Sequence, residues 1–287
     1  MVHQGKTLIQ KVLTFLLDNN GLDFRDYSEN FLDKQIVNWM SANSITTEKE
    51  GLVHLRTSEK NVQELVNLLL IGVTRLFRSP AFFLSFRKNI IPTLKTLPTI
   101  KIWCAGCSTG EEVYSLAILL KEEGLLDKCQ IYCTDINSKS LSTGQTGIYS
   151  YETIKAGIPN YVLSGGTSFF SNYYTSQYNS VLLEQELLQK TTWFQHNLVS
   201  DQVFKEVDVI ICQNVFIYFN TSLQDKVLHL FKQSLLPGGF LCLGEVESIR
   251  LLPTNTHFSP ADRRNSVHQL NINNSVIICG TFKQGPE

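Results

Sequence analysis

The chain has 287 residues, 43% of them hydrophobic and 10% aromatic, which is enough apolar material for a large core and excludes a wholly disordered protein. Its 25 basic and 26 acidic side chains give a net charge of −1, so we expect neither nucleic acid nor a membrane surface as a partner. Seven scattered cysteines indicate reduced thiols in the cytoplasm, and the apolar runs are far shorter than the ~20 residues that span a bilayer.

Apolar side chains recur at helical spacing through the first third of the chain. An Asn-Asn-Gly sequence after the first such stretch is typical of a helix end, and Ser79-Pro80 is typical of a helix start. Pro92 and Pro98 then indicate a linker, so we expect a helical domain over residues 1–92. The helices that the spacing predicts are one that ends at Asn19-Asn20-Gly21 and three over residues 31–40, 61–77 and 80–89.

From Lys101 onward, short apolar strands alternate with helices, which indicates a parallel α/β sheet in a second domain over residues 93–287. Residues 148–192 interrupt this alternation with a stretch rich in Tyr, Ser, Asn and Gly. We predict that they form an insertion with its own small sheet or hairpin, and a long surface excursion is the alternative. The pattern predicts strands over residues 102–104, 130–134, 207–212, 240–243 and 275–282, and helices over 111–123, 138–143 and 223–235.

The clearest local signal lies in Lys101–Glu112, where a strand leads through two glycines into a helix. Gly106 and Gly110 allow the backbone to approach a ligand closely, and the free amides of the helix start face that ligand. The segment lacks the Gly-Lys-Ser/Thr of a phosphate-binding loop and the third glycine of a dinucleotide fingerprint. Because Glu111 and Glu112 stand where an anion would bind, a cationic or zwitterionic ligand such as S-adenosyl-L-methionine (SAM) fits better. An ordinary structural turn with helix-start carboxylates is the alternative.

Polar residues also follow two other predicted strands. Asp135 ends the second strand, where a carboxylate can accept hydrogen bonds from ribose hydroxyls, although a helix cap is the alternative. Gln213 and Asn214 end the strand over 207–212, and Tyr218 follows at the expected mouth of the site, with packing as the alternative.

Two arginines lie beside aromatic residues in the segment from Thr74 to Pro80, and Arg78 is the second of them. Such a pair could clamp a carboxylate, whereas an exposed arginine at a helix end is the alternative. Cys104 with Cys107, and Cys129 with Cys133, are spaced like paired metal ligands. Since Cys is also a common small core residue on buried strands, we expect no metal site.

These segments, taken in order, resemble the chemotaxis receptor methyltransferase family (CheR-type). Enzymes of this family transfer a methyl group from SAM to glutamate side chains of chemoreceptors and release S-adenosyl-L-homocysteine (SAH). The matching segments are TRLFRSPAFF (74–83), KIWCAGCSTGEEVYSLAILL (101–120), IYCTDIN (131–137), GIYS (147–150), WFQHNL (193–198), DVIICQNVFIYF (208–219) and PGGFLCLGEVES (237–248).

The resemblance implies an N-terminal helical domain joined to a class I, Rossmann-like SAM-dependent methyltransferase domain with a small inserted β-subdomain. It implies a cytoplasmic enzyme, expected to be a monomer, that tunes receptor adaptation by methylating the glutamate-bearing helices of a chemoreceptor's cytoplasmic domain. It assigns Arg78 and Tyr218 to catalysis. The cofactor-binding residues that it implies are Thr74, Arg78, Ala105, Gly106, Glu111, Glu112, Asp135, Asn197, Leu198, Gln213, Asn214 and Val215.

The chain departs from the usual family pattern at several of these segments. Gln213 stands in place of an arginine, Val113 in place of a proline and Gly72 in place of an asparagine, and residues 244–247 alter the usual Gly-X-Ser-Glu. Two alternatives therefore stay open. One is a methyltransferase of the same fold that acts on another protein or a small molecule, and the other is a non-catalytic module that senses the cofactor.

Overall fold

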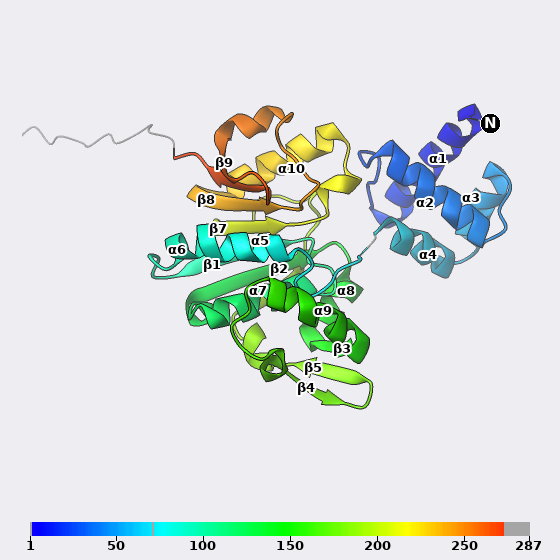
Figure 1. Ribbon diagram of the computed structural model, residues 1–287. Coiled ribbons are helices and arrows are strands. Elements are labelled where there is room, and N and C mark those ends of the chain that lie inside the picture. Colours follow the sequence, from blue (N-terminus) through cyan, green and yellow to red (C-terminus); the bar gives the residue numbers. More distant parts are fainter. Residues whose placement is uncertain (1, 71, 273–287) are drawn as a thin grey trace, which may run out of the picture.

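The computed structural model describes residues 2–70 and 72–272, which form a helical region followed by an α/β domain (Figure 1). Buried Leu16, Trp39 and Leu65 from three different helices meet in the core of the helical region. No helix within the described ranges is long and apolar enough to cross a membrane. The helices of this region are α1 (Val2–Asn20), α2 (Glu29–Ala42), α3 (Glu48–Thr57) and α4 (Glu59–Leu69).

The structure corrects the sequence-based prediction of this region at two places, the end of α4 and helix α3. The predicted helix over 61–77 ends at Leu69, and residues 72–75 have no regular secondary structure. The carbonyl of Gly72 accepts a hydrogen bond from the Ser108 hydroxyl at 3.1 Å. Helical spacing alone did not reveal this tertiary contact. The helix α3 was not predicted because its buried face is short, although Thr47 and Glu50 begin it with a reciprocal capping box.

The helix predicted from Pro80 is present but longer than expected, and the predicted linker at Pro92 is wrong. Helix α5 (Pro80–Ser85) continues through the π-helical turn η1 (Phe86–Ile90) into α6 (Ile91–Leu94). Pro92 falls in the first turn of α6, where a missing amide hydrogen is tolerated. Since α5 and α6 pack in the core of the α/β domain, the packing favours a domain boundary near residue 72 rather than 92.

The α/β domain is built on a seven-stranded sheet in the order β6-β2-β1-β7-β8-β10-β9, in which the first five strands are parallel. After β1 the next strand of the main sheet, β2, is added on one side of β1, and the later strand β7 is added on its other side. The strand order therefore reverses between β1 and β7. Ligands bind at the carboxyl ends of strands at such a point. The strands are β1 (Ile100–Ala105), β2 (Cys129–Asp135), β6 (Thr191–Gln195), β7 (Val207–Cys212), β8 (Leu235–Leu243), β9 (Phe258–Asp262) and β10 (Val267–Leu270).

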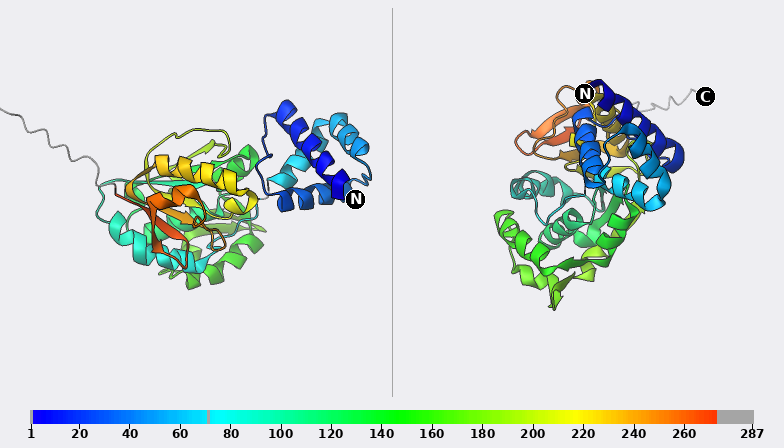
Figure 2. Two further views of the ribbon diagram at one scale, coloured as in Figure 1. Left: turned by 90° about the horizontal axis from the view of Figure 1, so that it is seen from above. Right: turned by 90° about the vertical axis from the view of Figure 1, so that its right-hand side faces the viewer.

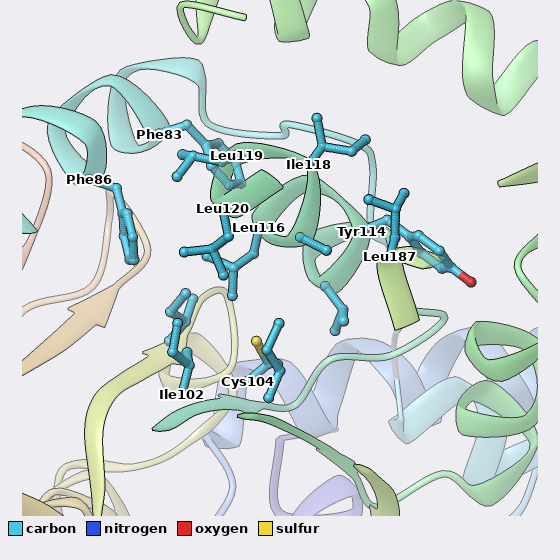
Figure 3. Packing of buried hydrophobic residues seen from close by; sticks show 14 of the residues in the cluster. Phe83, Phe86, Ile102, Cys104, Tyr114, Leu116, Ile118, Leu119, Leu120 and Leu187 are labelled. Atoms are coloured by element: carbon cyan, nitrogen blue, oxygen red, sulfur yellow. The ribbon is translucent and has the colours of Figure 1, made fainter. Parts of the chain in front are cut away.

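Helices cover both faces of this sheet because side chains along a strand alternate between faces. Ile102 and Cys104 of β1 face α5 and α7 (Glu111–Glu122). Leu116 and Leu120 of α7, together with Phe86, pack on these two side chains (Figure 3). The opposite face packs against α10 (Thr221–Ser234), and α8 (Ser138–Thr146) follows β2. The short 3-10 turns are η2 (Leu126–Lys128), η3 (Phe170–Tyr173), η4 (Gln185–Leu188), η5 (Phe216–Tyr218) and η6 (Pro253–His257).

The interrupting segment forms the small antiparallel sheet that the sequence predicted, with β5 (Ser180–Leu183) between β3 (Ile148–Ser150) and β4 (Tyr174–Gln177). It also contains α9 (Tyr151–Leu163), which was not predicted, and it ends before β6, which joins the main sheet. Strands β9 and β10 were likewise missed, and the predicted strand over 275–282 lies outside the described residues. Figure 2 shows the helical region at one end of the α/β domain.

Candidate functional site

A cleft of about 1080 Å³ opens at the carboxyl ends of β1, β2 and β7. Its walls come from the turns after these strands, the loop after β6, the segment over residues 72–78, and Tyr27 of the helical region. The cleft brings together eleven of the thirteen predicted site residues. They are Thr74, Arg78, Gly106, Glu112, Asp135, Asn197, Leu198, Gln213, Asn214, Val215 and Tyr218.

The turn between β1 and α7 is held by the neighbouring strand. The amides of Gly106 and Cys107 both donate to the carbonyl of Thr134, at 2.8 and 3.0 Å. Gly106 has φ +73°, and a Cβ built there would lie 2.6 Å from Cγ2 of Val215 across the cleft. Glycine is therefore required at this position both for its backbone conformation and for the close approach.

Two predicted residues of this turn do not reach the cleft. Glu111 is buried, and its carboxylate accepts a hydrogen bond from the Thr109 hydroxyl at 2.7 Å. Ala105 is buried on the side of β1 that packs with Trp103 in the hydrophobic core. Of the adjacent glutamates, Glu112 is the one that the structure places on the wall.

Glu112 is a carboxylate in an unfavourable electrostatic setting. Burial and then the Glu247 carboxylate raise the pKa of Glu112 to about 8, against the opposing effect of the Arg78 guanidinium. With no cation bound, this group is therefore mostly neutral at pH 7. A cationic ligand group would favour the carboxylate, so this wall selects for positive charge.

Asp135 is fixed by backbone amides on both of its oxygens. Oδ2 accepts from the Ser108 amide and Oδ1 from the Asn137 amide, each at 2.8 Å. Burial raises the pKa of Asp135, and these hydrogen bonds act against the rise. Because each carboxylate oxygen has a further lone pair, Asp135 can still accept hydroxyl donors from a ligand. The cap of α8 is Asn137, whose Oδ1 accepts from the Lys139 and Ser140 amides, and not Asp135.

The loop after β6 forms the wall beside Asp135. The Asn197 amide donates to Asp201 at 2.8 Å, while Asn197 Oδ1 accepts from the Val199 amide at 2.9 Å. Leu198 and Ile136 line the same part of the cleft and give it an apolar surface. A flat aromatic base fits such a combination of apolar side chains and peptide edges better than a charged group does.

The loop after β7 carries Asn214, Val215 and Tyr218, and Glu247 holds it in place. Glu247 Oε2 accepts from the amides of Gly244 at 2.6 Å and Asn214 at 3.0 Å, and Oε1 accepts from Ile217 at 3.3 Å. Asn214 has φ +61°, a conformation that is costly for a residue with a side chain. The carboxylate of Glu247 therefore stabilises a strained loop.

Arg78 faces this loop from the segment after α4. Its Nη1 donates to the Val73 carbonyl at 2.7 Å. Burial raises the pKa of Tyr218, the Arg78 guanidinium lowers it and the Glu247 carboxylate raises it. Arg78 and Gln213 also line a smaller cavity of about 400 Å³ beside the main cleft. Among the described residues, no partner is within hydrogen-bonding distance of the buried Gln213 Nε2.

Sequence reasoning missed several residues of the site, and three of them are important for its shape. Glu247 was noted only as part of an altered segment, and nothing in the sequence linked it to Asn214. His196 lines the cleft beside Asn197, and Tyr27 reaches it from the helical region. The place of His196 in the WFQHNL segment was a sequence signal that it belongs to the site. The sequence around Tyr27 gave no such signal.

The parts of the chain that the structure describes contain no group of three His, Cys, Asp or Glu side chains placed to hold a metal ion. Six cysteines in these parts are free and buried. Burial raises the pKa of each of the thiols of Cys104, Cys107 and Cys133. These thiols are therefore core residues in the protonated form.

A family model described as "CheR methyltransferase, SAM binding domain" matches residues 72–265. A Pseudomonas putida protein named "Putative methyltransferase Cher3" is 41% identical over 241 residues, which are 83% of this chain and 87% of that one. A chemotaxis protein methyltransferase of Borreliella burgdorferi is 26% identical over 260 residues, 85% of this chain and 89% of that one. Among solved structures, the glycopeptide N-methyltransferase MtfA complexed with sinefungin has a TM-score of 0.36 and 8% identity, covering 60% of this chain and 50% of that one.

Proposed function

Because the chain belongs to the CheR methyltransferase family, we propose that it methylates glutamate side chains in the cytoplasmic domain of a chemoreceptor. The observation that carries this proposal is the position of Arg78 and Tyr218. Both line a cleft whose other walls suit SAM, and the Arg78 guanidinium lowers the pKa of the Tyr218 phenol. A guanidinium and a phenol are the groups that would bind and orient a carboxylate.

The residues of the cleft fit SAM group by group. Asp135 would accept hydrogen bonds from the ribose hydroxyls, and Asn197 and Leu198 would flank the adenine. Glu112 would pair with the ammonium of the methionine part, and Gly106 allows the backbone to lie against the ligand. When bound, SAM supplies a methyl group on a sulfonium, an electrophile that needs no metal or redox partner.

The acceptor chemistry needs no general base. A glutamate side chain has a pKa of about 4.3, so at pH 7 it is already an ionised nucleophile. Positioning is therefore the main task of the protein, and good orientation can supply roughly 7–11 kcal/mol of the barrier. Arg78 would hold the oxygen that does not attack, and Tyr218 would orient the one that does.

We infer the partner and the compartment from the same proposal. The acceptor would be a glutamate-bearing helix of the receptor's cytoplasmic domain, so the enzyme would work in the cytoplasm and tune receptor adaptation. We further propose that it works as a monomer. Relatives that are named chemotaxis protein methyltransferases at 26–30% identity support this acceptor class.

One observation favours a second candidate, a methyltransferase of the same fold with a different acceptor. Gln213 offers an amide with no partner among the described residues beside Arg78, where the family pattern has a charged arginine. Losing that charge would weaken the preference for an acidic acceptor.

One experiment tests both candidates. The purified protein is incubated with methyl-labelled SAM and with membranes or soluble extract from cells that express their own chemoreceptors, beside Asp135→Ala as a control. The proposal predicts label in receptor bands that mild alkali releases as methanol, the signature of a carboxyl methyl ester. Label confined to alkali-stable products or to soluble acceptors would contradict it and favour the second candidate.

A further inference from the structure

Tyr27 stands apart from the rest of the site because it belongs to the helical region. It lies in the segment between α1 and α2, and its side chain is only 7% exposed. It nevertheless lines the cleft at the ends of β1, β2 and β7. The helical region is therefore a wall of the cleft and not only a neighbour of the α/β domain.

The segment that carries Tyr27 pairs with the segment that carries Tyr218. The Ser28 amide donates to the Tyr218 carbonyl at 2.8 Å, and the Asn220 amide donates to the Asp26 carbonyl at 2.9 Å. These bonds make an antiparallel bridge between Tyr27 and Phe219. The backbone on both sides of Tyr218 is thus fixed by the other domain and by Glu247.

Aromatic packing extends this pairing. The ring of Phe31, at the start of α2, lies 4.8 Å from the ring of Tyr218, and the rings of Tyr27 and Phe219 are 5.2 Å apart. Aromatic pairs at these separations attract one another beyond their burial alone. The side chain of Tyr218 is therefore held by a residue of the helical region.

Tyr27 lines the cleft although its ring is buried, so its hydroxyl is a candidate donor to a bound ligand. Tyr27, Asp135 and Tyr218 all line this cleft, and burial, the Asp135 carboxylate and the Tyr218 phenol raise the pKa of Tyr27, in that order. A phenol hydroxyl can donate one hydrogen bond, and a ligand in the cleft can accept it. The cleft between Tyr27 and Asp135 is where the sugar of a nucleoside would lie.

We propose that residues 26–31 of the helical region are part of the site. In this proposal the Tyr27 hydroxyl donates a hydrogen bond to the bound cofactor, opposite Asp135. Ser28 and Phe31 are positioning residues for Tyr218. The inference rests on cofactor binding and not on the identity of the methyl acceptor. It assigns the helical region a direct role in forming the pocket.

The first arm of the test is calorimetric titration with SAH of the full chain and of Tyr27→Phe, which keeps the ring and removes only the hydroxyl. Tyr132→Phe is the matched control, because Tyr132 is half-buried on β2 and does not line the cleft. We expect a Kd about three- to tenfold weaker for Tyr27→Phe and within about 1.5-fold of wild type for the control. A change below twofold for Tyr27→Phe would overturn the cofactor contact.

The second arm measures amide hydrogen exchange over residues 214–220 in Phe31→Ala, Phe31→Tyr and the control Val37→Ala, which alters an exposed residue of the same helix. The proposal predicts exchange at least about threefold faster in Phe31→Ala, with exchange in β1 unchanged and wild-type rates in the other two variants. Equal exchange in Phe31→Ala and Val37→Ala would show that the helical region does not position Tyr218. Neither arm uses a methyl acceptor, so failure of the proposed acceptor leaves both outcomes interpretable.

Discussion

The two sides of the cleft are ordered in different ways. On the side of β1 and β2, amides of the turn after β1 donate to the Asp135 carboxylate and to the Thr134 carbonyl at the end of the adjacent strand. On the opposite side, Tyr218 depends on Glu247 and on the helical region, with Asn220 and Asp26 in contact although 194 positions apart. The first side would set cofactor affinity and the second the rate of methyl transfer, so variants should separate the two quantities.

The largest expected effect on the cofactor side is that of Gly106→Ala. Its Cβ would come within 2.6 Å of the Val215 side chain, which lines the cleft, so we expect SAH binding to weaken by at least about 30-fold. The matched control is Gly124→Ala, which has a similar φ of +70° but open space around it. It should lose some stability and keep its affinity. If calorimetry found equal affinities for the two variants, the close approach at Gly106 would not matter.

On the transfer side, Glu247→Gln should leave a buried amide facing backbone N–H donors. We expect turnover to fall about tenfold and stability to fall by about 1–3 kcal/mol, with a smaller change in SAH affinity. The exposed neighbour Glu245 provides the control Glu245→Gln, which should behave as wild type in both assays. A loss of SAH affinity larger than the loss of turnover would contradict the assignment of Glu247 to the side of the cleft that sets the rate of methyl transfer.

The smallest expected effect concerns pH and Glu112. Its raised pKa, about 8, means that the free site is mostly protonated below this pH, and pairing with an ammonium requires the carboxylate. Cofactor binding should therefore release a proton, and affinity should fall about threefold from pH 8.5 to 7.5. Calorimetry in buffers of different ionisation enthalpy measures this release. In Glu112→Gln, proton release from this group should disappear, and persistence of the full release would assign it to another group.

The sequence predicted the cofactor side better than the transfer side, and the reason is physical. A glycine turn after one strand and an acid after the next must meet when both strands lie parallel in one sheet, so Gly106 and Asp135 could be placed together without coordinates. Side-chain direction was less predictable, since adjacent Glu111 and Glu112 look alike in sequence but only Glu112 reaches the cleft.

Contacts between distant segments carried no such signal. The sequence positions of Tyr27 and Phe31 do not predict a contact with Tyr218, because aromatic residues near a helix start are common. The predicted helix over 61–77 failed for the same reason, since its end at Leu69 is followed by a contact between Gly72 and Ser108. Tertiary contacts override local periodicity at such points.

The most direct test of the division between the two sides is the initial rate of methyl transfer by Arg78→Ala, measured against SAM concentration with a methylatable receptor fragment. In the proposed mechanism Arg78 holds the acceptor carboxylate, so we expect kcat to fall by at least about 100-fold while KM for SAM stays within about threefold of wild type. Unchanged kcat, or a rise in KM that accounts for the whole loss, would contradict the assignment of Arg78 to methyl transfer.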